Sequence, residues 1–370
     1  MGCIELLSYD SFRDYVAPYK KVFIICGYSS LASCCSDLLD SLRLQGISYD
    51  IFSEFTPNPT TEDVDRAIEM FSNDNYDAII SIGGGSAIDV GKCVKMFCHM
   101  GTEDWENKLK SVKCVEKIPL IAMPTTAGSG AEATSFAVIY YSGVKQSVSA
   151  KELLPNAVLF DGRCLSSLPL YQKKATVLDA LGHCIESYWS VHSTKESKSF
   201  AETGIRIILE KFEDYLDGKS ETNEDMQRAA YLAGKAINVT KTTAGHAMAY
   251  KLTTLYGFAH GHAVALCLRV LWPWMIRNTA KCCDERGREY LEGTFDELAT
   301  IFGCKDAMQG AERYGKIVGW ASLAVPRFSE EDISVLTNSV NPLRMSNNPI
   351  KLERADIENL YRGIMENESR

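Results

Sequence analysis

The chain has 370 residues, and its 46% hydrophobic and 24% charged side chains are proportions typical of a folded globular protein. Its 39 basic and 48 acidic side chains give a net charge of −9. This balance argues against a nucleic-acid partner and against an anionic membrane surface, because both attract basic proteins. The length exceeds what one hydrophobic core comfortably serves, which predicts two domains.

The cysteines and the most apolar segment indicate a cytoplasmic protein. The thirteen cysteines are odd in number and none stand in C-x-x-C spacing, so we expect reduced, mostly buried thiols. Residues Met1–Asp10 lack the basic and apolar regions of a signal peptide. The apolar run Gly257–Ile276 contains His260, Arg269 and Pro273, which are costly in a bilayer, so it predicts a buried helix and no membrane span.

The first part of the chain alternates apolar runs of strand length with helical patterns. The predicted strands are Lys21–Cys26, Ser48–Phe52, Ala78–Ile82, Ile118–Met123, Val138–Tyr141 and Ala157–Phe160. Helical spacing of apolar residues occurs at Leu31–Leu44 and Thr61–Phe71. Strands separated by helices form a parallel sheet with helices on both faces. We therefore predict an α/β domain over residues 1–165, in which the last two strands are peripheral or returning.

Helical patterns take over from Leu168 onward. Apolar residues recur at three- and four-residue spacing in Thr176–Ser190, Ser197–Leu216, Asp225–Asn238, Ala244–Leu255 and Asp356–Met365. We therefore predict an all-helical domain over residues 166–370. No low-complexity tract separates the two domains, so a hinge between packed domains is expected.

Two glycine-rich turns in the first domain suit phosphate binding. Gly83–Ser86 follows a predicted strand and opens a helix, with Ser86 as the candidate N-cap and Asp89 three residues later. Glycines allow close approach of the backbone to an anion, and a helix N-terminus offers unpaired amides. Thr125–Gly130 is a similar loop after the next strand, and such loops meet at the carboxyl edge of a parallel sheet. Together they indicate a nucleotide or dinucleotide cradle; the alternative is a pair of tight turns without a ligand.

The second domain contains a candidate metal site. Asp179 and His183 stand at i and i+4 of one predicted helix, His246 begins another helical stretch, and His260 follows fourteen residues later. One carboxylate with three imidazoles suits Fe(II), and Zn(II) is possible. The alternative is that each histidine satisfies a hydrogen bond in the core.

These motifs, taken in order, resemble the iron-dependent alcohol dehydrogenase family. The matching residues are Gly83-Gly84-Gly85-Ser86-x-x-Asp89, Thr125-Thr126-Ala127-Gly128-Ser129-Gly130-x-Glu132, Asp179-x-x-x-His183-x-x-Glu186, and the pair His246 and His260. The resemblance implies an N-terminal dinucleotide-binding domain, a helical metal-binding domain, an active site in the cleft between them, and a homodimer. Lys145 looks like the family lysine that reaches the cofactor, although a solvated loop lysine fits equally well.

The resemblance also implies a mechanism, with two departures from the family pattern. Metal ligands Asp179, His183, His246 and His260 would position a metal that polarises an aldehyde carbonyl, which exchanges hydride with a nicotinamide. Many relatives have a further histidine four residues after His246, where this chain has Tyr250. Tyr250 or nearby His262 could relay a proton instead.

The second departure concerns the adenosine end of the cofactor. Many relatives end the first strand with an aspartate that repels a 2′-phosphate, and this chain has Gly27 there, followed by serines. This favours NADPH, although NADH remains open. The expected cofactor-binding residues are Gly27, Ser29, Gly83, Gly84, Gly85, Ser86, Asp89, Thr125, Thr126, Ser129 and Lys145.

The stretch Lys241–Thr253 looks like the hydroxyethylphosphonate dehydrogenase branch of the family, which reduces phosphonoacetaldehyde. Lys241 and Thr242 are the expected anchors of the substrate anion, with Arg269 as a second candidate. Other possibilities are a general short-chain alcohol dehydrogenase, a sugar-phosphate cyclase of the dehydroquinate-synthase type, or a non-catalytic nucleotide- or metal-binding protein. The cyclases use a glutamate and two histidines, which differs from the set in this chain.

Overall fold

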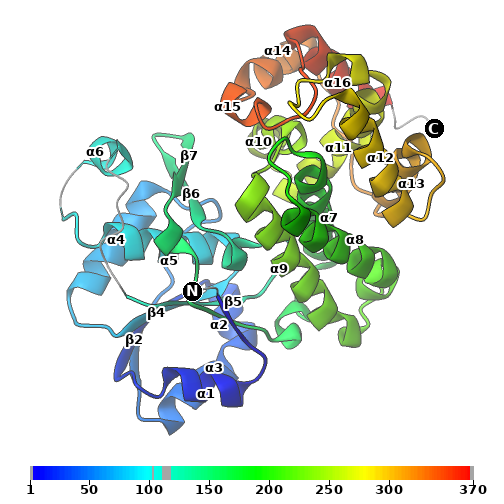
Figure 1. Cartoon of the computed structure of the whole chain (residues 1–370). Helices are drawn as coiled ribbons and strands as arrows, with labels where there is room; N and C mark the ends of the chain where they lie inside the picture. The colour runs from blue at the N-terminus through cyan, green and yellow to red at the C-terminus, as the bar shows by residue number, and fades with distance from the viewer. Residues whose placement is uncertain (1–2, 102–103, 111–117, 367–370) are drawn as a thin grey trace. The chain divides into compact units, whose positions relative to one another are not determined.

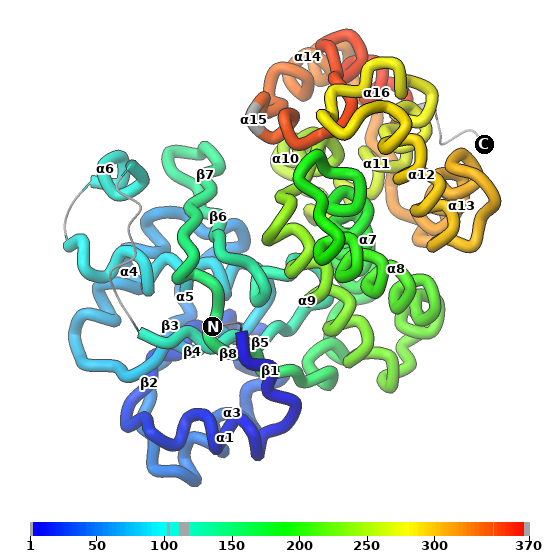
Figure 2. Tube along the Cα trace, viewed as in Figure 1, coloured from blue at the N-terminus to red at the C-terminus, as the bar shows by residue number. Residues whose placement is uncertain are grey.

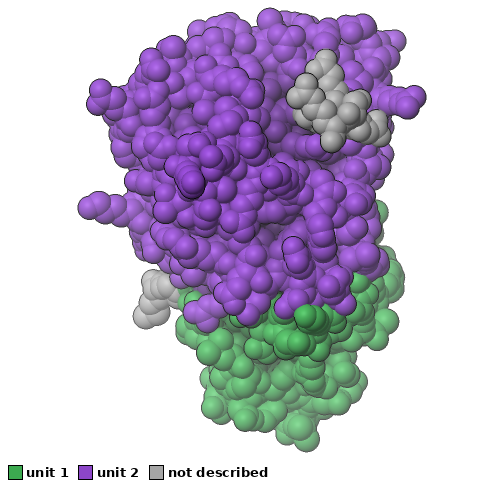
Figure 3. Space-filling model, turned by 90° about the vertical axis from the view of Figure 1, so that its right-hand side faces the viewer, with its two compact units in different colours: residues 1–168, 218–227 green, residues 169–217, 228–370 purple. Residues whose placement is uncertain are grey.

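The computed structural model describes residues 3–101, 104–110 and 118–366. It divides into two compact units, unit 1 with residues 1–168 and 218–227, and unit 2 with residues 169–217 and 228–370 (Figure 3). Met1 and Gly2, at the start of the segment that lacks signal-peptide features, lie outside the described residues.

Unit 1 is built on a six-stranded parallel sheet in the order β1-β8-β5-β4-β2-β3. Its strands are β1 (Ile4–Leu6), β2 (Lys21–Cys26), β3 (Ser48–Phe52), β4 (Ala78–Gly83), β5 (Leu120–Pro124) and β8 (Ala157–Leu159). Strands β4 and β5 are buried along their whole length, as expected for central strands of a parallel sheet. The predicted α/β class is confirmed.

Helices cover both faces of this sheet (Figure 1). Helices α4 (Thr61–Ser72) and α5 (Gly85–Phe97) lie on one face, and α1 (Tyr9–Val16) and α3 (Ser36–Leu44) lie on the other. The remaining elements are α2 (Tyr28–Cys34), α6 (Trp105–Lys110), η1 (Ala131–Ala133), the hairpin β6 (Phe136–Tyr141) with β7 (Val144–Ser149), η2 (Lys151–Leu153), η3 (Gly162–Leu165) and η4 (Ser220–Thr222).

Two details of unit 1 differ from the sequence prediction, and a third, the placement of the last two predicted strands, agrees with it. The helix predicted over Leu31–Leu44 is two helices that share Cys35 as a cap residue, a break that neither Gly nor Pro marks. Strand Ile4–Leu6 was not predicted, because three residues carry too little pattern. The run that begins at Ala157 returns into the sheet between β5 and β1, whereas the run over Val138–Tyr141 leaves it as a hairpin (Figure 2).

Unit 2 is helical throughout its described residues, as predicted. Its helices are α7 (Leu170–Trp189), α8 (Lys195–Leu216), α9 (Asn223–Thr240), α10 (Ala244–Tyr256), α11 (His260–Arg277), η5 (Thr279–Lys281), α12 (Arg288–Ile301), α13 (Ala307–Trp320), α14 (Glu330–Ser339), α15 (Pro342–Met345) and α16 (Arg354–Glu366). The first residues of α9 belong to unit 1. Helix α11 packs against α7, α10, α13 and α16, so it forms the centre of this unit.

The apolar run that begins at Gly257 is this central helix. Gly257 ends α10 in the left-handed conformation, with φ of 69°, and α11 starts at His260. Within the part of the chain that the structure describes, no helix is long and apolar enough to cross a membrane. Among the same residues, the twelve cysteines are all free thiols.

Candidate metal centre and dinucleotide-binding loops

Helix α7 supplies two of the expected metal ligands from its buried middle. Asp179 and His183 are one turn apart, and the two residues are 7% and 5% exposed. Burial of a carboxylate is costly unless charges or hydrogen bonds compensate it. Burial raises the pKa of Asp179, but His183, His246 and His260 outweigh this effect and lower it below its ordinary value. The three predicted histidine ligands therefore all influence the carboxylate of the fourth, Asp179.

Three of these ligands converge on one point. The ligand atoms of Asp179, His246 and His260 lie within 4.8 Å of one another. Asp179 Oδ1 is 3.5 Å from His246 Nε2, and both atoms are buried and have no hydrogen-bond partner among the described residues. Buried polar atoms without partners are rare and usually mark an ion or water. A carboxylate oxygen facing imidazole nitrogens fits a divalent metal of the first row.

His183 lies beside this group of three without belonging to it. Its ring stacks on that of His246, with centroids 4.4 Å apart and planes 18° apart. His183 therefore lies next to the other candidate ligands, and its own role as a metal ligand stays a prediction.

Glu186 is a functional candidate to which the sequence reasoning gave no role. It is fully buried and accepts hydrogen bonds from Thr243 Oγ1 (2.7 Å) and the His246 amide (3.2 Å). Its Oε2 also bonds to His246 Nδ1, which leaves Nε2 to face Asp179. Carboxylates commonly orient metal-binding histidines in this way. The sequence signal that could have identified Glu186 was its spacing, because it lies seven residues, or two helical turns, after Asp179.

The charge of His246 depends on these two carboxylates. Burial lowers the pKa of His246, but Glu186 and Asp179 outweigh burial and raise it to about 9. A metal must then displace a proton from this imidazole at neutral pH.

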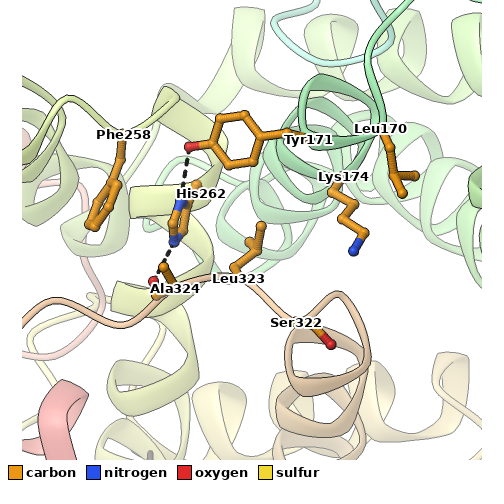
Figure 4. A pocket seen from close by; sticks show the side chains of 8 residues that line it. All are labelled: Leu170, Tyr171, Lys174, Phe258, His262, Ser322, Leu323 and Ala324. Atoms are coloured by element: carbon orange, nitrogen blue, oxygen red, sulfur yellow. Dashed lines mark hydrogen bonds between the residues drawn. The ribbon is translucent and has the colours of Figure 1, made fainter.

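The two predicted proton-relay residues have different surroundings. The ring of Tyr250 stacks on that of His260, with centroids 5.3 Å apart and planes 2° apart. His262 is buried, and its ring nitrogens contact the hydroxyl of Tyr171 (3.0 Å) and the carbonyl of Ala324 (2.8 Å), as Figure 4 shows. Tyr250 is therefore the one of the two that stacks directly on a candidate ligand.

The predicted anion anchors precede α10. Lys241 follows α9 directly in the left-handed conformation, with φ of 59°, which is uncommon for a residue with a side chain. Thr242 is buried, and its Oγ1 lies 3.5 Å from Nη1 of Arg344 on α15. No sequence motif joins Arg344 to Lys241, because the two residues lie about a hundred positions apart. The sequence therefore did not identify Arg344.

A pocket of about 440 Å³ opens elsewhere in unit 2. It is lined by Leu170, Tyr171, Lys174, Phe258, His262, Ser322, Leu323 and Ala324 (Figure 4). Apart from His262, none of the predicted site residues line it.

In unit 1, the two glycine-rich loops lie together, as expected for loops at the carboxyl edge of a parallel sheet. The Thr125 amide donates to the Gly83 carbonyl at 3.0 Å, and Ser30 Oγ is 3.2 Å from Thr125 Oγ1. A Cβ at Gly84 would meet Thr126 at 3.2 Å, and one at Gly85 would meet Ser129 at 3.1 Å. Glycine therefore allows the two loops to touch at the carboxyl ends of β4 and β5.

The prediction that Ser86 is an N-cap is wrong. Helix α5 begins at Gly85 with Gly84 as the cap residue, and Ser86 Oγ accepts from the Asn58 amide instead. The available amides thus come two residues earlier than predicted, in the glycines themselves.

Asp89 and Lys145 connect α5 to the β6–β7 hairpin. Asp89 accepts from the Val138 amide at 3.1 Å. Burial raises the pKa of Asp89 to about 6, against the opposing effect of Lys92 and Lys145. Asp89 therefore contacts the middle of β6, and Lys145 is the second residue of β7, one residue pair from the turn of the hairpin.

The first turn contains the remaining predicted cofactor residues. Gly27 caps α2 with φ of −64°, and a Cβ there would meet only Phe55, at 3.7 Å. Ser29 is exposed in the first turn of α2. The turn therefore has room for a larger residue than glycine.

Comparison with known proteins agrees with these features. Residues 7–162 match the family model of iron-containing alcohol dehydrogenases, and residues 173–365 match that of the family's C-terminal region. Alcohol dehydrogenase 4 of Schizosaccharomyces pombe is 34% identical, over 88% of this chain and 77% of that protein. Phosphonoacetaldehyde reductase of Streptomyces viridochromogenes is 27% identical, over 82% of this chain and 80% of that protein.

A solved structure extends the likeness to three dimensions. The crystal structure of an iron-containing alcohol dehydrogenase has a TM-score of 0.85 and 26% identity, and the match covers 99% of this chain and 98% of that one. Because the two family models together match nearly the whole chain, the protein belongs to the iron-containing alcohol dehydrogenase family and is an oxidoreductase.

Proposed function

We propose that this enzyme catalyses the metal-dependent, NAD(P)H-linked reduction of phosphonoacetaldehyde to 2-hydroxyethylphosphonate. The observation that carries the reaction class is the pair of buried, unpartnered atoms Asp179 Oδ1 and His246 Nε2, which face each other beside His260. The substrate rests on the resemblance of Lys241–Thr253 to phosphonate-reducing enzymes, and on a relative named phosphonoacetaldehyde reductase.

Asp179, His183, His246 and His260 are the proposed metal ligands, with Fe(II) as the metal and Zn(II) as the alternative. A divalent metal held there would polarise a carbonyl oxygen, and a bound nicotinamide would supply the hydride. Glu186 fixes the orientation of His246 through Nδ1, so Nε2 stays directed at Asp179.

We assign proton transfer to the phenol oxygen of Tyr250. Its ring stacks on His260, which places it beside the ligand group. Burial raises the pKa of Tyr250, while Arg344 and a hydrogen bond with Thr242 oppose that rise. His262 is the second candidate, but its contacts with Tyr171 and Ala324 suit a positioning role.

The loops of unit 1 are the proposed dinucleotide site. Gly83, Gly84, Gly85 and the Thr125–Ser129 loop offer backbone amides and hydroxyls to a pyrophosphate. At the adenosine end, Gly27 places no carboxylate where a 2′-phosphate would lie, so we propose NADPH as the preferred cofactor.

The proposed substrate anion lies against Lys241 and Thr242, a cation and a hydroxyl in the turn that leads into the helix of His246. By family resemblance, we further propose a cytoplasmic homodimer, which size-exclusion chromatography with light scattering tests.

The direct test is the oxidation of NADPH at 340 nm with phosphonoacetaldehyde, after reconstitution with Fe(II) or Zn(II). Propanal is the neutral comparison. We expect Lys241→Ala to lower kcat/KM for phosphonoacetaldehyde about ten- to a hundredfold, because a charge-assisted hydrogen bond is lost. The same change should hardly affect propanal. Turnover of neutral aldehydes alone would favour the second candidate, a general short-chain alcohol dehydrogenase, which the likeness to alcohol dehydrogenase 4 also supports.

A further inference from the structure

A second cation lies beside the proposed anion anchor. Arg344 reaches from the short helix α15, which packs against α10, and its Nη1 is 3.5 Å from Thr242 Oγ1. Asn347, on the same segment, donates to the Thr242 carbonyl at 3.0 Å. A segment that is remote in sequence is thus fixed to the turn that contains Lys241.

The guanidinium of Arg344 is also tied to the candidate metal ligands. Its central carbon lies 4.8 Å from the centre of the Tyr250 ring, a cation–π contact. Tyr250 in turn stacks on His260. The guanidinium therefore contacts Tyr250, which in turn contacts the proposed ligand His260. This arrangement suits binding of the far end of a short substrate.

The two cations affect each other electrostatically, and Lys241 Nζ also donates to the Asn238 carbonyl at 3.4 Å. Burial lowers the pKa of Lys241, and the positive charge of Arg344 lowers it further. Among the described residues, no carboxylate forms an ion pair with Arg344. Lys241 also has a left-handed backbone, and strained residues of this kind persist where the surroundings or a ligand demand them. Two neighbouring cations in one partly buried place indicate a site for an anion.

We propose that Arg344 determines substrate specificity, and that with Lys241 it binds the terminal oxyanion of a short aldehyde. We call Arg344 and Lys241 the cation pair. A guanidinium presents a planar fork that binds two oxygens of a phosphonate or sulfonate at once, whereas an ammonium acts as a point charge. The pair carries two positive charges, so a phosphonate dianion is the best match, a sulfonate is weaker, and a neutral chain end is disfavoured. This inference rests on the proposed aldehyde reductase function.

The test compares phosphonoacetaldehyde with 3,3-dimethylbutanal, in which a neutral tert-butyl group replaces the phosphonate. Arg344→Ala should lower the ratio of kcat/KM for phosphonoacetaldehyde to kcat/KM for the neutral aldehyde about ten- to a hundredfold. Arg344→Lys keeps the charge but loses the fork, so its loss on phosphonoacetaldehyde should be intermediate. Sulfoacetaldehyde, a monoanion of similar shape, tests whether the site prefers a dianion. The wild type should reduce it less efficiently than phosphonoacetaldehyde.

Lys251→Ala is the matched control, because Lys251 is a partly exposed cation on the helix that also bears Tyr250. It should leave the ratio between the two aldehydes unchanged. Equal losses on both aldehydes in Arg344→Ala would overturn the inference and make Arg344 a structural residue.

Binding of ethylphosphonate, measured by calorimetry on the metal-free protein, separates this inference from the reaction itself. The wild type should bind it at least tenfold more tightly than Arg344→Ala. If the wild type reduces no aldehyde but this difference remains, the proposed reaction fails and the cation pair stands. If aldehydes are reduced but the difference is absent, the cation pair fails and the reaction stands.

Discussion

At the scale of single residues, the candidate centre depends on which atoms burial leaves unsatisfied. Glu186 takes up Nδ1 of His246, and the remaining nitrogen then faces Asp179 without a hydrogen-bond partner among the described residues. A carboxylate placed behind a ligand raises its basicity and holds the ring in one orientation. The spacing of Asp179, His183 and Glu186 along one helix could be seen in the sequence, but the Glu186–His246 bond required the fold.

Glu186→Gln should weaken metal binding about ten- to a hundredfold, because the amide holds and polarises His246 less well. The pH dependence should change as well. The folded-state pKa of His246 is raised to about 9, so its protonated form stabilises the metal-free fold below pH 6.5, and this contribution is lost as the pH rises through 9. Because metal and proton compete for this imidazole, apparent metal affinity should rise by up to about tenfold per pH unit between 6.5 and 9.

Zn(II) titration calorimetry at several pH values measures both effects. Glu186→Gln should flatten the pH profile, since its loss lowers the pKa of His246. An unchanged profile in this variant would mean that Glu186 does not control the proton on His246.

Gly27→Asp is the residue-scale prediction for the cofactor. The position has φ of −64° and room for a side chain, so the fold should tolerate the change. A carboxylate near a 2′-phosphate repels it, so the preference should shift from NADPH toward NADH by tenfold or more. The ratio of kcat/KM for the two cofactors measures the shift, and Gly27→Asn is the uncharged control. A wild type that already prefers NADH tenfold would contradict this interpretation of the turn.

At the scale of elements, helix spacing brings the ligands together. Helix α11 starts at His260 and passes so close to α7 that a Cβ at Gly261 would lie 2.0 Å from the Ala175 carbonyl and 2.6 Å from Asp179 Cβ. Only glycine allows this approach, which places His260 beside Asp179. The sequence predicted both helices from their apolar spacing but not the contact between them.

Gly261→Ala should push α11 away from α7. Overpacking of this kind costs about 1–3 kcal/mol of unfolding free energy, which chemical denaturation measures. Metal affinity should fall as well, because His260 moves relative to Asp179. Gly319→Ala is the matched control, since Gly319 lies in α13 with open space around it and should be neutral or slightly stabilising. Wild-type metal affinity in Gly261→Ala would show that the close approach does not set the ligand geometry.

At the scale of the whole molecule, the proposed dinucleotide site and the proposed metal site belong to different units. The glycine-rich loops belong to unit 1, whereas Asp179, His183, His246 and His260 belong to unit 2. A ligand that binds the folded state stabilises the elements that contact it. The two ligands should therefore protect different parts of the chain.

Hydrogen–deuterium exchange measures this protection. Zn(II) should slow exchange in the middle of α7 and in the first turns of α10 and α11, and NADPH should slow it in the loops at Gly27–Ser30, Gly83–Ser86 and Thr125–Gly130. His260→Ala should remove the first effect and keep the second. Protection of the unit 1 loops by Zn(II) alone would contradict the assignment of the ligands.

The sequence by itself determined the class of each part and the order of the motifs. The buried strands of a parallel sheet appear in the sequence as continuous apolar runs, and amphipathic helices appear as apolar residues at three- and four-residue spacing. Both signals are local. Asp179 and His183 were predictable together for the same reason, because one turn of a helix joins them. The N-cap of α5 was wrongly predicted at Ser86, because three successive glycines offer several possible helix starts.

The tertiary structure decided what meets across long separations in the sequence. It brought Glu186 to His246 and Arg344 to Thr242, neither of which is joined by a periodic pattern, whereas the meeting of the loops at Gly84 and Thr126 was expected from the parallel sheet. Such contacts depend on how whole helices and strands pack, and packing is determined by the combined shape of many side chains. The proposed substrate preference belongs to this level, because Lys241 acquires its neighbouring cation only when α15 folds back against α10.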